Sequence, residues 1–137
     1  VNATAAVLPG FKRRRAGHLV VVASVAGYRG LPTAAGYGAT KAALINYTEA
    51  MKFDLDPWGV KTQLVCPGFV RTPLTDRNPF PMPFLMEVED AARALVRGMR
   101  GSGFEITFPK RFTILVRMVS RLPYALYFPL VRRGTKG

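Results

Sequence analysis

Residues 18–41 read HLVVVASVAGYRGLPTAAGYGATK, and this stretch decides the fold. Its first part is apolar and rich in β-branched side chains, which is typical of a parallel strand covered on both faces. We therefore predict a strand over 18–24, with Ser24 at its end. After a loop, a helix is predicted from about Tyr37 to Asp56, and its small residues permit close packing.

The rest of the chain continues this alternation of strand and helix. Residues 1 to about 15 read as the end of a helix. The run VKTQLVC predicts a strand over 60–66, and a short last strand is expected over 104–108. Between them lies a predicted helix of about 88–99, closed by Gly101. Strands that alternate with helices indicate an α/β fold built on a parallel sheet.

Three polar side chains in the first stretch suit acid–base chemistry on a carbonyl group. Ser24, Tyr37 and Lys41 stand thirteen and then four residues apart. Residues four apart on a helix share a face, with Cβ atoms about 5–6 Å apart, so the Lys41 ammonium is expected near the Tyr37 phenol. A phenol in water has a pKa of about 10, and a neighbouring cation favours its ionised form. Each residue taken singly also fits a purely structural role.

A second signal follows in the run CPGFVRT over 66–72. In this order, the two signals resemble the catalytic half of the short-chain dehydrogenase/reductase family, over roughly residues 8–108. The resemblance implies hydride transfer between a nicotinamide and a carbonyl or alcohol. It also implies that Ser24 holds the substrate oxygen, that Tyr37 is the acid and base, and that Lys41 tunes Tyr37 and binds the nicotinamide ribose.

The resemblance assigns a second set of residues to the cofactor, which it implies is NAD or NADP. The set is Pro67, Gly68, Val70 and Thr72, together with Tyr37 and Lys41. The position of Val70 would hold the nicotinamide through its main chain, and that of Thr72 through its hydroxyl. A glycine lets backbone approach a ligand closely, although an ordinary turn after a strand also explains the motif.

The resemblance further implies the C-terminal part of a Rossmann-like, doubly wound parallel sheet, with 60–66 between 18–24 and 104–108. The first helix would then continue past Pro9, which ordinarily breaks a helix. The chain has neither Gly-x-x-x-Gly-x-Gly nor Asn-Asn-Ala-Gly and does not begin with Met. We therefore expect a fragment of a longer enzyme that, alone, neither binds nicotinamide tightly nor turns over.

The loop over 73–86 is rich in apolar side chains. They are Phe80, Met82, Phe84, Leu85 and Met86. Pockets for apolar ligands are lined by such residues, so the expected substrate is a hydrophobic carbonyl or alcohol. The alternative is that these side chains only pack against the neighbouring helix.

We divide the chain into a dehydrogenase-like part, 1–109, and a basic amphipathic extension, 110–137. The extension contributes seven of the cations behind a formal net charge of +12 and has no acidic residue. The seven are Lys110, Arg111, Arg117, Arg121, Arg132, Arg133 and Lys136. Its apolar residues recur at helical spacing, but no run reaches the ~20 residues of a membrane span. The extension is expected either to dock on the domain or a second subunit, or to lie on an anionic membrane.

The remaining features limit the classes of function. Cys66 is the only cysteine, so there is no disulfide framework and no metal set, and its side chain is expected to be a small buried hydrophobe. No motif for nucleic acid accompanies the charge, so nucleic acid is not expected as a partner. The expected location is the cytoplasm, with membrane association left open. The alternative function is a non-catalytic, basic, dehydrogenase-like module that binds membrane or protein.

Overall fold

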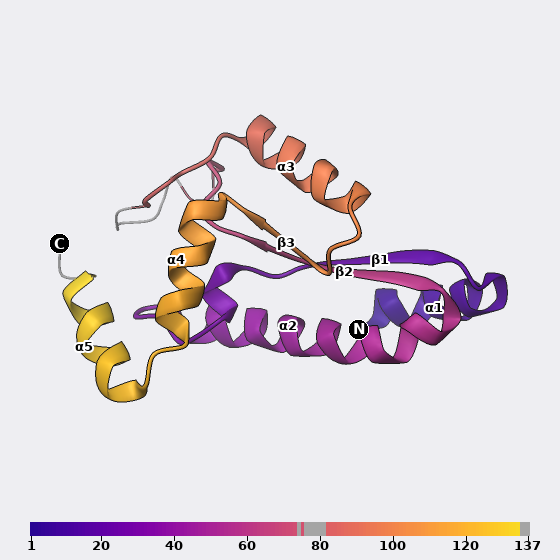
Figure 1. Cartoon of the computed structure of the whole chain (residues 1–137), viewed down its shortest axis with the longest axis horizontal. Helices are drawn as coiled ribbons and strands as arrows, with labels where there is room; N and C mark the ends of the chain where they lie inside the picture. The colour runs from indigo at the N-terminus through magenta and orange to yellow at the C-terminus, as the bar shows by residue number, and fades with distance from the viewer. Residues whose placement is uncertain (74, 76–81, 135–137) are drawn as a thin grey trace.

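The computed structural model describes residues 1–73, 75 and 82–134 and contains a three-stranded parallel sheet (Figure 1). Its strands are β1 (Gly17–Val22), β2 (Val60–Pro67) and β3 (Glu105–Phe108), in the order β1-β2-β3. The register pairs Leu19 with Thr62 and Val65 with Ile106. The predicted α/β class and the central position of the second strand are therefore confirmed.

Helices cover both faces of this sheet. Helices α1 (Asn2–Arg14) and α2 (Ala35–Leu55) lie on one face, and α3 (Val88–Arg100) lies on the other (Figure 1). The side chains of β2 account for helices on both faces, because successive side chains of a strand point to opposite faces of the sheet. Leu64 and Cys66 pack with residues of α2, whereas Val65 packs with Ala91 of α3. This three-layer arrangement confirms the doubly wound sheet.

The first helix passes through Pro9 without interruption, as the resemblance implies. Its C-cap is Arg15, which has left-handed backbone angles (φ 48°). The carbonyl oxygen of Arg15 would lie 2.7 Å from a Cβ at Gly59, which itself has φ of 69°. Only glycine fits this position without strain, because the turn into β2 requires both a positive φ and a close approach to Arg15.

The strand expected over 18–24 ends two residues early, at Val22. Ala23 still donates its N–H to the Val65 carbonyl at 2.8 Å. Ser24 is instead the N-cap of a short 3₁₀ helix, η1 (Val25–Gly27), and its Oγ accepts the Ala26 N–H at 3.2 Å. A serine side chain that bonds nearby backbone in this way competes with the sheet ladder, which is why the strand does not reach Ser24.

The C-terminal extension is helical, in agreement with the spacing of its apolar residues, and forms α4 (Lys110–Ser120) and α5 (Tyr124–Gly134). Phe112 of α4 is buried in a cluster with Val25, Leu64 and Cys66. The inner side of α4 therefore completes the core beside the carboxyl ends of β1 and β2. Within the described residues, no helix combines the length and the apolar character needed to cross a membrane.

Helix α5 is held to the loop that joins Ser24 to α2. The Arg29 guanidinium donates to the Ser120 carbonyl at 2.7 Å and also to the Leu122 carbonyl. It lies 4.3 Å and 4.1 Å from the ring centroids of Tyr124 and Tyr127. The Tyr127 hydroxyl donates to the Gly30 carbonyl at 2.8 Å. These contacts fix the position of the extension relative to the loop.

Candidate functional site

Lys41 lies at the carboxyl end of β1, beside Tyr37. The Lys41 Nζ is 3.5 Å from the Val22 carbonyl oxygen and 5.6 Å from the centroid of the Tyr37 ring. Both residues lie in the first two turns of α2, which begins at Ala35. The Tyr37 side chain is 53% exposed, so it remains accessible to a small molecule. The four-residue spacing thus produces the predicted pairing of ammonium and phenol.

Ser24 is buried where β1 passes into η1. No hydrogen bond joins Ser24 to Tyr37 in the part of the chain that the structure describes. The segment after Ser24 nevertheless packs against the turn of α2 that carries Lys41. A Cβ at Gly27 would lie 2.7 Å from the backbone carbon of Lys41 and 2.8 Å from the nitrogen of Ala42. Gly27 therefore sets how closely α2 approaches the Ser24 segment.

We expect Gly27→Ala to destabilise the protein by about 1–3 kcal/mol, because overpacking a filled contact forces backbone to move. The added methyl would press on the backbone of α2 and not on a flexible side chain. Urea denaturation measures the change. Gly36→Ala is the matched control, because nothing lies within 4 Å of its Cβ position. Equal stability of the two variants would contradict this account of Gly27.

Gly68, in the loop after β2, is explained by packing within the protein and does not require a ligand close to its backbone. The Gly68 N–H donates to the Phe108 carbonyl at 2.8 Å. A Cβ at Gly68 would lie 2.7 Å from a carbon of the Phe112 ring and 3.3 Å from Pro109. Packing against α4 is thus sufficient to require glycine here, and no local pattern in the sequence indicates this contact.

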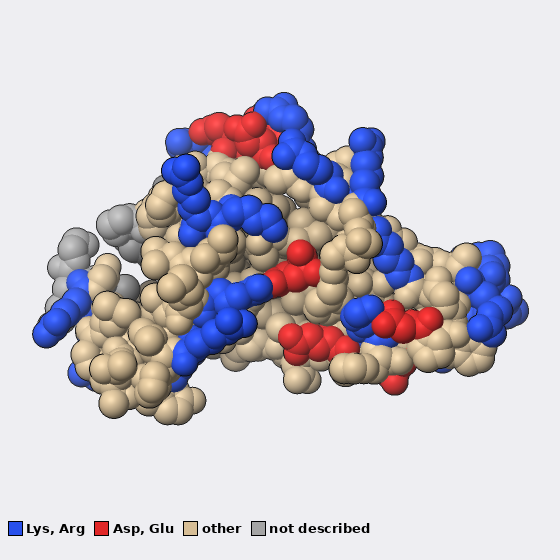
Figure 2. Space-filling model, in the orientation of Figure 1, with Lys and Arg blue, Asp and Glu red and all other residues tan. Residues whose placement is uncertain are grey.

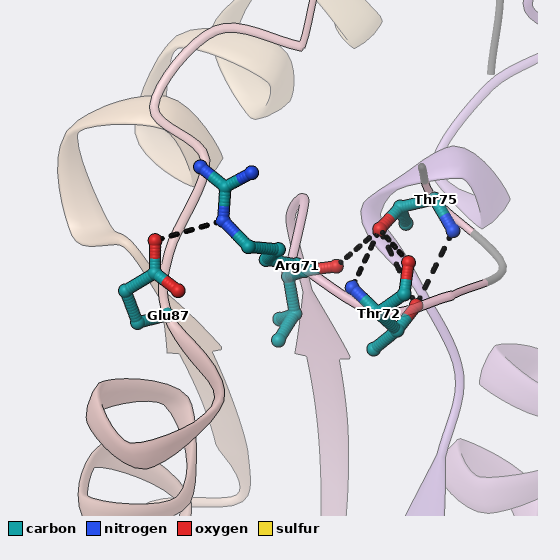
Figure 3. Close-up of polar contacts among 5 residues, drawn as sticks. Arg71, Thr72, Thr75 and Glu87 are labelled. Atoms are coloured by element: carbon teal, nitrogen blue, oxygen red, sulfur yellow. Dashed lines mark hydrogen bonds and ion pairs between the residues drawn. The ribbon is translucent and has the colours of Figure 1, made fainter. Parts of the chain in front are cut away.

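Beyond Gly68, the backbone is paired with the segment that leads into α3. The Arg71 N–H donates to the Met86 carbonyl at 2.8 Å, and the Met86 N–H donates to the Phe69 carbonyl at 3.0 Å. Figure 3 shows the Arg71 side chain directed to Glu87, to which its Nε donates at 2.9 Å. Because backbone groups alternate in direction along an extended segment, the groups of Val70 face the side opposite Met86.

Thr75 meets Val70 and Thr72 on that opposite side (Figure 3). Its Oγ1 accepts the Thr72 N–H at 2.8 Å and lies 2.9 Å from the carbonyl oxygens of both Val70 and Thr72, so it donates to one of them at a time. The Thr75 N–H donates to the Thr72 Oγ1 at 3.3 Å. The Val70 carbonyl oxygen and the two hydroxyls therefore lie on one side of the loop, bonded to one another. Thr75 is not among the site residues predicted from the sequence.

A partly buried polar network lies next to the Ser24 segment, and no pattern in the sequence predicts it. The Tyr28 hydroxyl donates to the Glu105 carboxylate, with which Arg117 forms an ion pair. Burial, followed by the proximity of Cys66, raises the pKa of Tyr28 to about 12, so the phenol keeps its proton at neutral pH. Burial also raises the pKa of the Cys66 thiol, as expected of a small core residue. The network joins the loop between Ser24 and α2 to β3 and α4.

The described contacts thus bring the predicted residues together in two groups. Lys41, Tyr37 and the end of β1 form one, and Val70 and Thr72 form the other, at the carboxyl end of β2. Parallel strands place their carboxyl ends at the same edge of the sheet, where open α/β folds bind ligands. Convergence of the two groups with Ser24 on one cleft stays a prediction.

Comparisons with known proteins agree with the fold. A family model described as short chain dehydrogenase matches residues 1–80. The chain is 43% identical over 128 residues to an uncharacterized oxidoreductase of Myxococcus xanthus, covering 93% of this chain and 51% of the relative. It is 31% identical over 123 residues to human 17-beta-hydroxysteroid dehydrogenase 13, covering 88% of this chain and 41% of the relative. The chain spans about half the length of these curated relatives.

Solved structures resemble the fold over almost the whole chain. A short chain dehydrogenase from Burkholderia cenocepacia in complex with NADP has a TM-score of 0.78 and 25% identity, covering 96% of this chain and 54% of that one. A short-chain dehydrogenase from Sphingobium yanoikuyae in complex with NADPH has a TM-score of 0.71 and 27% identity, covering 89% and 52%. The sheet order, the spacing of Ser24, Tyr37 and Lys41, and the match over residues 1–80 lead to one conclusion: this chain belongs to the short-chain dehydrogenase/reductase family.

Proposed function

We propose that this chain carries the catalytic half of an NAD(P)-dependent oxidoreductase acting on a carbonyl or alcohol. Family membership supports the reaction class, and the two solved relatives above hold NADP and NADPH. The observation that carries the proposal is the position of Lys41, 5.6 Å from the Tyr37 ring and next to the end of β1. We keep 1–109 as the dehydrogenase part and 110–137 as its extension, and the choice between NAD and NADP stays open.

Tyr37 is proposed as the proton donor in carbonyl reduction. As the carbonyl carbon gains hydride, its oxygen becomes an alkoxide, and the Tyr37 hydroxyl supplies the proton that completes the alcohol. The nearby Lys41 ammonium then stabilises the phenolate left on Tyr37. Alcohol oxidation reverses these steps, with the phenolate taking the proton from the alcohol.

Ser24 is proposed to hold the substrate oxygen. Its Oγ accepts the Ala26 N–H at 3.2 Å, which uses a lone pair and leaves the hydroxyl hydrogen able to donate. A donor aimed at the substrate oxygen stabilises the alkoxide that develops there. The cap therefore fixes Ser24 in place without using its hydrogen.

The nicotinamide, when bound, supplies or accepts the hydride. We propose that the end of β2 and the loop after it hold the nicotinamide, through Pro67 and Gly68, the main chain of Val70 and the hydroxyl of Thr72. Thr75 supports this loop by its bonds to Val70 and Thr72. Tyr37 and Lys41 are proposed to contact the ribose on the other side of the site.

The proposed substrate is apolar. Phe84, which is 51% exposed, has its ring 6.1 Å from that of Phe112. Phe80, also named from the sequence, lies outside the described residues. An exposed aromatic side chain next to a buried one provides an apolar surface for an alkyl or ring system.

Replacing Ser24 with alanine is expected to lower kcat/KM by about 10²-fold, the cost of one lost donor to a developing oxyanion. The assay uses the full-length protein, NADH or NADPH, and a panel of apolar ketones, and it follows both nicotinamide oxidation and alcohol formation. Ser102→Ala, at an exposed position before β3, is the control. Failure of the native protein to form any alcohol would overturn the proposed function, whereas an unaffected Ser24→Ala variant would overturn only the role of Ser24.

A further inference from the structure

The outer side of α4 is apolar although it faces solvent. Ile114, Leu115 and Met118 are 57%, 52% and 65% exposed. Phe112 and Thr113, on the opposite side of the helix, are buried against the core. The helix is therefore apolar on both sides, and docking on the core accounts for only one of them.

Helix α5 carries a second exposed apolar area. Four of its large side chains are 47–68% exposed, whereas Tyr127 is buried. The four are Tyr124, Leu126, Phe128 and Leu130. Together with Ile114, Leu115 and Met118 of α4, we call these residues the outer tail surface. Figure 2 shows the area over α5 as mostly uncharged, with basic side chains at its margin.

Two arginines lie on the same side of α4 as its exposed apolar residues. Arg111 precedes Ile114 and Leu115 by three and four positions, and Arg121 follows Met118 by three, so both arginines lie on the outer side of α4. Both are exposed. No Asp or Glu occurs anywhere in 110–137. The outer tail surface is thus apolar and positively charged at once.

We propose that the outer tail surface binds the surface of an anionic lipid bilayer. Apolar side chains enter the boundary between headgroups and acyl chains while arginines contact lipid phosphates and carboxylates, as in helices that lie in the membrane interface. The described helices are not suited to span a membrane, so the contact is peripheral. Arg29 and Tyr127 hold α5 to the domain, so the surface is already formed before it meets a bilayer.

Charge and polarity argue against two other partners. A second copy bound face to face would bring Arg111 and Arg121 of both copies together with no acidic residue of 110–137 to pair them. The phosphates of a nucleic acid would neutralise the arginines. They would also lie against the apolar side chains, which gain nothing from contact with charged groups. An anionic bilayer satisfies both kinds of side chain.

The test is sedimentation of the full-length protein with vesicles of phosphatidylcholine alone or mixed with phosphatidylserine. We expect binding to the mixed vesicles only, and weaker binding at high salt because exposed charges are screened. Arg111→Gln with Arg121→Gln should weaken binding about 25-fold, or about fivefold for each cation at ~1 kcal/mol. Met118→Ser with Leu126→Ser should weaken it at least about tenfold, because buried apolar area is lost.

Matched controls come from exposed residues on other helices. Phe53→Ser on α2, where Phe53 is 82% exposed, and Arg13→Gln with Arg14→Gln on α1 should bind mixed vesicles like the native protein. Equal binding to both vesicle types, no binding to either, or equal losses in the control variants would overturn the proposal. Self-association or nucleic-acid binding that depends on Arg111 and Arg121, without vesicle binding, would do the same. Because the measurement requires no turnover, its failure would leave the proposed function standing.

Discussion

Replacing Tyr37 with phenylalanine is expected to lower kcat by about 10²–10⁴-fold, the range for loss of a positioned acid. The phenyl ring still fills the same space beside Lys41, and the Lys41 ammonium remains to bind the ribose, so the dissociation constant of the nicotinamide should change little. Only the hydroxyl group, with its transferable proton, is lost. The measurement is steady-state kinetics with the best ketone of the panel, combined with a fluorescence titration of the reduced cofactor.

Tyr47→Phe provides the comparison for this variant. Tyr47 lies on the same helix, farther from the end of β1, and has no part in the proposed chemistry. Its kcat should equal that of the native protein. If Tyr37→Phe retains the native kcat, the proposed proton transfer is wrong, whatever the substrate.

Replacing Lys41 with alanine should lower kcat by about 10²-fold or more and also weaken cofactor binding. One ammonium is proposed to interact with two partners, the Tyr37 phenolate and the nicotinamide ribose. Its loss should therefore lower both kcat and the affinity for the cofactor. The same kinetics and titration separate the two effects. This double loss distinguishes Lys41→Ala from Tyr37→Phe, in which affinity is kept.

Lys52→Ala is the control for charge on the same helix. Its ion pair with Asp56 is exposed, and such pairs contribute about 0–1 kcal/mol, so neither kcat nor affinity should change. A Lys41→Ala variant that loses kcat but keeps its cofactor affinity would remove the ribose from the proposal. A variant that keeps both would remove Lys41 from the site.

The sequence pattern of the C-terminal extension predicts its helices but does not decide what their apolar sides contact. Helical spacing of apolar residues in 110–137 predicts helices, and α4 and α5 are present. The same spacing is compatible with docking on the domain and with membrane contact, because both bury an apolar face. The structure shows which of these side chains dock on the domain, because Phe112 and Tyr127 are buried, whereas Met118 and Leu126 are exposed.

The sequence by itself determined the order of strands and helices, the sheet class, and the pairing of Tyr37 with Lys41. These properties depend on local periodicity and on the fixed geometry of a helix turn, which neighbouring residues specify. It placed the end of the first strand too late, because the cap formed by Ser24 overrides the apolar pattern at that point.

Only the tertiary structure decided the contacts that surround the candidate site. Gly27 is required by the backbone of Lys41, and Gly68 by the ring of Phe112. Tyr28 finds its partners Glu105 and Arg117 at separations of 77 and 89 residues. Such contacts depend on how layers pack and not on any repeating local pattern, because a side chain and its distant partner become neighbours only after the sheet and its helices have assembled.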